Sequence, residues 1–175
     1  HSRDLEHCIK VWEDTKVEFR RATRADVAAF TAIRVEFLTL IRSIENTEAF
    51  YRHTLDYLYE HIDQNDLLIY LAVDQGKIGS TCMACLFQTA PLPSCVTGRS
   101  AELLNVYTLS DYRRMGLAET LIRMLLEELQ RRGVEKVLLD YTDDGLPLYE
   151  KLGFTRLPYE MQLKLPMNPL SDPFR

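Results

Sequence analysis

Hydrophobic and polar positions in the first half of the chain recur with two different periods. Residues 17–20 alternate as in a short strand. Apolar residues then recur every three or four positions, which predicts one helix over about 27–41 and a second over about 47–62. Two longer apolar runs, 67–73 and 77–87, flank a short glycine-containing turn and predict an antiparallel hairpin.

The first predicted helix carries a start signal and one ambiguous position. Thr23 and Asp26 have the spacing of a capping box. The apolar face of this helix passes through Phe30 and Phe37, and either Ile33 or Arg34 fills the position between them.

Strands and helices alternate in the second half of the chain. Residues 88–100 have no period and predict a loop. After it we expect a strand at 102–109, a helix at 116–132, a strand at 134–141, a short helix at 143–152, and closing strands at 154–156 and 160–165.

The length of 175 residues suits one domain. We expect an N-terminal tail at 1–14, a single domain over 15–165 and a proline-containing C-terminal tail at 166–175.

Charge and composition exclude several classes of protein. The formal net charge of −5 argues against a nucleic-acid binder, which needs a basic face. No apolar run reaches the ~20 residues that span a bilayer, so we expect no membrane partner. Four cysteines are too few for a dense disulfide framework and favour a reducing compartment, so we expect a cytoplasmic protein.

The connection between the strand at 102–109 and the following helix has the features of a phosphate-binding turn. It reads Arg-x-x-Gly-x-Ala, with Arg113, Gly116 and Ala118 at the named positions. Backbone N–H groups at a helix N-terminus are unpaired, and the helix dipole favours an anion there. Taken alone, the turn also fits an ordinary strand-to-helix connection.

A second motif at residues 142–154 reads Thr-Asp-Asp-Gly-Leu-Pro-Leu-Tyr-Glu-Lys-Leu-Gly-Phe. In this order the two motifs resemble the GCN5-related N-acetyltransferase (GNAT) superfamily, over about residues 17–165. The resemblance implies an α/β (α+β) fold with a mixed, mostly antiparallel sheet of six to seven strands and about four helices. It also implies acetyl-CoA as the cosubstrate, bound where the sheet opens between the strands at 102–109 and 134–141.

The resemblance implies which residues bind acetyl-CoA. The turn would grip the pyrophosphate, and backbone groups of the preceding strand would pair with the pantetheine arm and polarise the thioester. The residues implied in cofactor binding are Val106, Tyr107, Thr108, Arg113, Arg114, Met115, Gly116, Leu117, Ala118, Thr142 and Tyr149.

Tyr149 is the main catalytic candidate, because the resemblance implies a tyrosine beside the thioester sulfur. Tyrosine has a pKa near ~10 and a thiol near ~8.5, so full proton donation to the thiolate costs about 2 kcal/mol. A hydrogen bond to the departing sulfur would serve nearly as well. The alternative is that Tyr149 only packs its helix against the sheet.

The general base is less defined. The resemblance points to a carboxylate in one of two regions, where Glu102 and Glu36 are the candidates. Either one also fits a solvated surface position, because sequence does not reveal burial or a raised pKa.

The expected acceptor is the primary amine of a small molecule or peptide. Direct attack in a ternary complex is expected, since no cysteine lies in a recognisable nucleophile motif. The two N-terminal helices and the loop at 88–100 would line the acceptor site. By resemblance we also expect a homodimer, in contact through the C-terminal strand or tail.

No metal is expected. Cys82 and Cys85 have the spacing of half a zinc site, but residues three apart on a strand point to opposite faces. His53, Tyr57 and His61 share one helical face without a third ligand and indicate a polar surface.

Two other functions stay open. The chain could be a CoA-binding or interaction module that lacks a working acceptor site, because no general base is identified. A different nucleotide-binding protein is disfavoured, since neither Gly-x-x-x-x-Gly-Lys-Ser/Thr nor Gly-x-Gly-x-x-Gly occurs.

Overall fold

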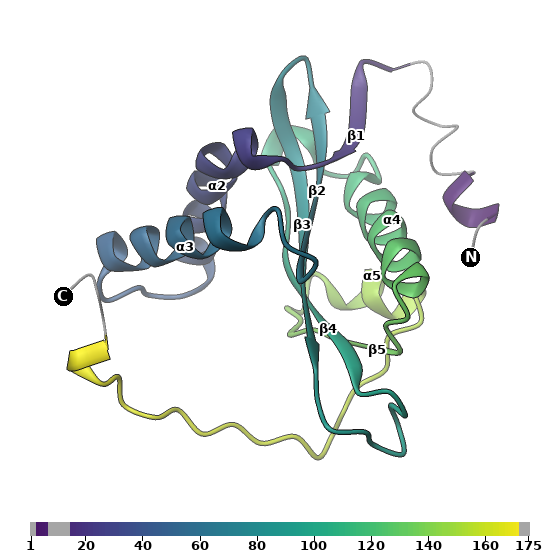
Figure 1. The fold of residues 1–175 in the computed structure, drawn as a ribbon. Helices are drawn as coiled ribbons and strands as arrows, with labels where there is room; N and C mark the ends of the chain where they lie inside the picture. The colour runs from purple at the N-terminus through teal and green to yellow at the C-terminus, as the bar shows by residue number, and fades with distance from the viewer. Residues whose placement is uncertain (1–2, 7–14, 172–175) are drawn as a thin grey trace.

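The computed structural model describes residues 3–6 and 15–171, and its centre is a five-stranded sheet (Figure 1). The strands lie in chain order, and neighbours are antiparallel except for the parallel pair β4 and β5. Their bounds are Val17–Arg21 (β1), Leu67–Asp74 (β2), Lys77–Gln88 (β3), Arg99–Thr108 (β4) and Lys136–Leu138 (β5).

Two helices cover each face of the sheet (Figure 1). One face carries α2 (Val27–Ile41) and α3 (Thr47–His61). The other carries α4 (Leu117–Arg131) and the short α5 (Leu146–Lys151), in which Pro147 suits the first turn. Each face therefore has its own apolar core, centred on Phe30 and Leu58 on one side and on Leu121 and Leu125 on the other.

The start of α2 follows the predicted capping box. The Asp26 carboxylate accepts the Thr23 backbone N–H at 2.8 Å and forms an ion pair with Arg20 at 2.8 Å. The hydrogen bond from Arg20 holds the pKa of Asp26 below its ordinary value. A single 3₁₀ turn, Arg24–Asp26, precedes the helix.

The predicted fold class is confirmed, with differences at the C-terminal side of the sheet. β5 covers only three residues of the strand expected at 134–141, and α5 begins three residues later than expected. The strands expected at 154–156 and 160–165 are absent, so the described part of the chain has five strands rather than six or seven. Pro158 and Pro166 each remove a ladder donor here, and side chains around them stay exposed.

The predicted loop at 88–100 is shorter than expected, since β3 extends to Gln88 and β4 begins at Arg99. The Glu135 carboxylate accepts backbone N–H groups of Val96 and Thr97 at 3.1 and 2.8 Å and holds this loop near β5. Cys82 and Cys85 lie on opposite faces of β3, as predicted, because each packs in a different core.

No helix in the described ranges combines the length and the apolar character that crossing a bilayer requires.

The α2 side of the core is tested by Phe30→Ala. Phe30 is fully buried, so its truncation should lower the free energy of unfolding by about 3–5 kcal/mol, measured by urea denaturation. Leu40→Ala on the same helix is the matched control, because Leu40 is 69% exposed and should change stability by about 0.5 kcal/mol or less. Equal effects of the two substitutions would contradict this packing.

Candidate functional site

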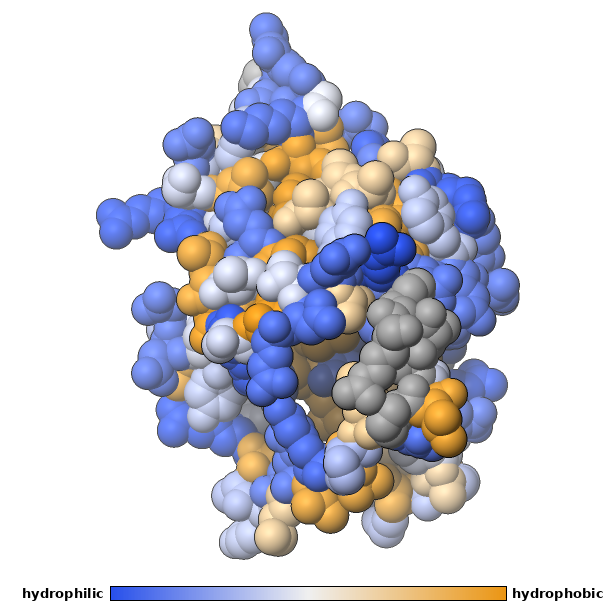
Figure 2. Space-filling model, turned by 90° about the vertical axis from the view of Figure 1, so that its left-hand side faces the viewer, coloured by the Kyte–Doolittle hydropathy of each residue, from blue (hydrophilic) through white to orange (hydrophobic). Residues whose placement is uncertain are grey.

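A cleft of about 860 Å³ opens where β4 and β5 separate. The two strands pair only from Ser100 to Glu102, so from Leu103 onward β4 has no neighbouring strand on that side within the described residues. The cleft is bounded by this free stretch of β4, the N-terminus of α4, α5 and the second half of α2. Its volume is in the range of small-molecule sites. The side of the molecule that carries α2 and α3 is also visibly hollowed (Figure 2).

Most of the predicted cofactor residues line this one cleft: Val106, Tyr107, Thr108, Arg113, Arg114, Gly116, Leu117, Ala118, Thr142 and Tyr149. Met115 does not line it, and its side chain is exposed.

A β-bulge on β4 shapes the wall of the cleft. Asn105 and Val106 together face the single residue Cys82, and Asn105 has the left-handed φ of 52°. The Asn105 amide donates to Thr81 Oγ1 at 3.0 Å, and that hydroxyl donates back to the Asn105 carbonyl at 2.9 Å. These bonds stabilise a backbone conformation that residues other than glycine rarely adopt.

The bulge sets which side chains face α2. Tyr107 stacks on Phe37 with ring centroids 4.8 Å apart, and Asn105 accepts a hydrogen bond from Arg34, so both face α2. Val106 packs against the core on the α4 side instead. Asn105 and Tyr107 therefore share one face of β4, and Val106 takes the other.

The turn before α4 leaves backbone amides available at the other end of the cleft. Arg114 and Gly116 have φ of 62° and 77°, and no side chain caps the helix. A Cβ placed on Gly116 would meet open space, so the backbone is accessible here. Arg113 Nε donates to the Thr108 carbonyl at 3.2 Å and joins the turn to the end of β4. Together with the two exposed arginines, these amides can bind a phosphate.

Tyr149 lies at the junction of this cleft with a second one. It is 9% exposed and packs edge-on against Phe154, with ring centroids 5.8 Å apart. Burial, with a smaller contribution from Cys82, raises the pKa of Tyr149 to about 12. Full proton transfer to a thiolate would then cost about 5 kcal/mol, so the hydroxyl is better suited to donating a hydrogen bond.

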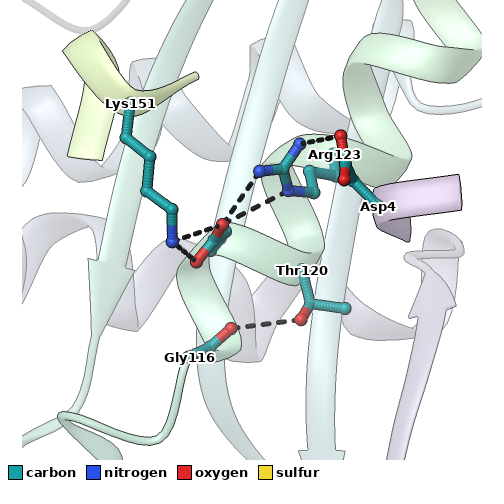
Figure 3. A network of polar contacts seen from close by, with 6 residues as sticks. Asp4, Gly116, Thr120, Arg123 and Lys151 are labelled. Carbon is teal, nitrogen blue, oxygen red and sulfur yellow. Dashed lines mark hydrogen bonds and ion pairs between the residues drawn. The ribbon is translucent and has the colours of Figure 1, made fainter. Parts of the chain in front are cut away.

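A charged network joins α5, which carries Tyr149, to α4 (Figure 3). Lys151, two residues after Tyr149, forms an ion pair with Glu119 of α4 at 2.9 Å. Arg123 binds the same carboxylate at 3.0 Å and reaches Asp4 at 3.8 Å. Burial raises the pKa of Glu119, but Lys151 and Arg123 outweigh this and hold it below its ordinary value. The network therefore stays charged and fixes α5 relative to α4.

The two candidate bases lie outside the lining of the large cleft. Glu36 is exposed on α2 and accepts a hydrogen bond from the Tyr107 hydroxyl at 3.4 Å. Glu102 lines the second cleft, of about 550 Å³, to which Tyr149 also contributes. The role of base stays a prediction for both.

Sequence reasoning missed several polar residues that line the large cleft, among them Arg34, Arg42, Asp140 and Tyr141. Arg34 carried a signal, because the apolar face of its helix passed through either Ile33 or Arg34. A cation on an apolar face is unusual enough to indicate a function. The other three follow the ends of α2 and β5, where no local pattern marks a site.

The chain matches the model of the Acetyltransferase (GNAT) family over residues 35–154. It is 44% identical over 55 residues to glucosamine 6-phosphate N-acetyltransferase of Trypanosoma brucei brucei, which covers 31% of this chain and 37% of that protein. It is 39% identical over 57 residues to the ribosomal protein bS18-alanine N-acetyltransferase of Escherichia coli K12, a match that covers 31% of this chain and 38% of that protein. The chain thus matches under two fifths of the length of these relatives.

Solved structures share the fold at lower identity. A predicted acetyltransferase with acetyl-CoA from Clostridium acetobutylicum has a TM-score of 0.77 and 24% identity, covering 85% of this chain and 96% of that one. A GCN5-related N-acetyltransferase from Ralstonia eutropha JMP134 has a TM-score of 0.78 and 20% identity, and the match covers 85% of this chain and 98% of that one.

Proposed function

Because the chain belongs to the acetyltransferase (GNAT) family, we propose that it transfers an acetyl group from acetyl-CoA to a primary amine of a small molecule or peptide. The observation that carries the proposal is the single cleft that joins the amides before α4, the free stretch of β4 and Tyr149. The names of the relatives, which include a sugar phosphate and a ribosomal protein as acceptors, support an amine acceptor.

The residues present fit acetyl-CoA. The amides of Leu117 and Ala118, with Arg113 and Arg114, would bind its pyrophosphate at the uncapped end of α4. Val106 to Thr108, on the stretch of β4 that has no pairing with β5, would pair with the pantetheine arm. Thr142 is already held at the cleft, since its hydroxyl accepts the Gly145 N–H at 3.3 Å.

Bound acetyl-CoA supplies the activated thioester, and the chain supplies orientation and hydrogen bonds. Backbone N–H groups near the bulge would stabilise the developing oxyanion. The Tyr149 hydroxyl is protonated at neutral pH, as its raised pKa reinforces, and would donate a hydrogen bond to the departing sulfur. Glu102 or Glu36 would accept the proton of the amine, through a water where the distance requires it.

Direct attack by the amine is supported by the state of the described cysteines. Burial raises the pKa of both Cys82 and Cys85, which keeps them as thiols at neutral pH. Cys95 is also buried, and none of these three residues lines the cleft.

We also place the protein in the cytoplasm. Cys82, Cys85 and Cys95 are free thiols, a state typical of a reducing compartment.

A homodimer is supported by the segment that follows Phe154, which runs extended along the lower edge of the molecule (Figure 1). Its apolar side chains alternate with polar ones and are 54–99% exposed: Leu157, Tyr159, Met161, Leu163 and Leu165. This period of two is that of a strand with one face buried. We propose that the segment packs on the sheet of a second copy.

Tyr149→Phe tests acetyl transfer and the role of the hydroxyl. We expect kcat to fall by about 10- to 100-fold, because a hydrogen bond to the leaving sulfur is lost. The Kd of acetyl-CoA should change by about 3-fold or less. The measurement is thiol release with a panel of amines, and Tyr70→Phe is the control, a half-buried tyrosine outside the cleft.

Full activity of Tyr149→Phe would exclude a catalytic hydroxyl. Wild-type protein that binds acetyl-CoA but turns over no amine would instead support the binding-module alternative.

Incubation with acetyl-labelled acetyl-CoA alone tests direct attack. We expect intact-mass spectrometry to find no acetylated cysteine, because the described thiols are protonated and lie outside the cleft. Stable label on a cysteine that then passes to an amine would overturn the direct mechanism.

Light scattering tests the homodimer. We expect a mass twice the chain mass of 20.4 kDa, and a monomer after the double substitution Met161→Lys and Leu163→Lys. Glu160→Lys with Gln162→Lys, on the polar positions of the same segment, is the matched control and should stay dimeric. A monomeric wild type would contradict the proposal.

A further inference from the structure

Arg34 differs from the other half-buried arginines of the described chain. Arg20, Arg123 and Arg132 each form an ion pair with a carboxylate, at 2.8, 3.0 and 3.0 Å. Arg34 forms none within the described residues. Its one hydrogen bond goes to the neutral Asn105 Oδ1, at 3.3 Å.

The surroundings of Arg34 do not neutralise its charge. Burial lowers the pKa of Arg34, and the groups that act against this are Cys85 and Tyr57. Both are neutral at pH 7, because burial raises the pKa of each. A desolvated cation without a counter-ion is costly and is normally paired in a folded protein.

The place of Arg34 in the cleft separates it from the pyrophosphate end. It lines the cleft at the bulge, beside Asn105, whereas Arg113 is bound to Thr108. Asn105 and Thr108 are three residues apart on β4, which corresponds to about 10 Å along the strand. The cleft also contains carboxylates, but Asp140 and Asp144 follow β5, and Glu119 is already paired with Lys151.

A guanidinium has five N–H donors in a planar fork, which matches the two oxygens of a carboxylate or phosphate. We propose that Arg34 binds an anionic group of the acceptor, so that the substrate is an amine that also carries a carboxylate or a phosphate. The inference rests on the proposed acetyl transfer and deepens it: the anion is held at the bulge while the amine faces the thioester.

Matched amines test the anion site in two arms. β-Alanine is compared with propylamine for the carboxylate, and phosphoethanolamine with ethanolamine for the phosphate. We expect wild-type kcat/KM to favour the anionic member of at least one pair by 10-fold or more, and the preferred pair identifies the anion.

Arg34→Met keeps the length of the side chain and removes its charge. It should abolish that preference and leave kcat/KM for the neutral amine and the Kd of acetyl-CoA within 3-fold. Arg34→Lys should retain part of the preference. Lysine keeps the positive charge but lacks the planar guanidinium that binds two oxygens at once. Arg52→Met, on α3 and outside the cleft, is the control. The melting temperature of Arg34→Met should change little, because the loss of the hydrogen bond to Asn105 is offset by the removal of an unpaired, desolvated charge.

Ligand-induced shifts of the melting temperature provide a readout independent of turnover. If the anionic amines stabilise wild type but not Arg34→Met, and no amine is turned over, the anion site is supported while acetyl transfer fails. If amines are turned over without a preference for the anionic member of a pair, or if Arg34→Met keeps the wild-type preference, the anion site is contradicted. The proposed acetyl transfer is then still supported. The absence of any Arg34-dependent stabilisation or preference likewise overturns it.

Discussion

The site depends on one constraint, the short pairing between β4 and β5. Three residue pairs hold the two strands together, and from Leu103 onward the edge of β4 on the β5 side has no neighbouring strand in the described part of the chain. The backbone groups of such an edge need partners from water or a ligand. Because this free edge lies between the helices of the two faces, the sheet itself creates the cleft.

The features around this edge divide the cleft into functional parts. At one end the uncapped N-terminus of α4 and two exposed arginines favour an anion. At the bulge, Arg34 donates a hydrogen bond to the side-chain oxygen of Asn105. Tyr149 lines the same cleft, and the ion pair of Lys151 with Glu119 joins its helix to α4. The proposed pyrophosphate and acceptor positions correspond to these two ends of the cleft.

Local patterns predicted most of the fold, and the family resemblance named residues that the structure brings together in one cleft. The turn at Arg113 to Ala118 and the motif of Tyr149 are contiguous, so their chemistry is readable from sequence, and ten of the eleven predicted cofactor residues line one cleft. The closing strands were predicted wrongly because a strand needs a neighbouring edge, which depends on distant residues. Asn105 and Arg34 depend on contacts across 71 residues, which no local period encodes.

The central claim is that this cleft binds acetyl-CoA, and isothermal titration calorimetry of the purified protein tests it most directly. Saturable one-site binding of acetyl-CoA, with no binding of ATP or NAD, is the predicted result. The absence of acetyl-CoA binding would mean that the turn before α4 is only structural, and it would contradict the proposed function.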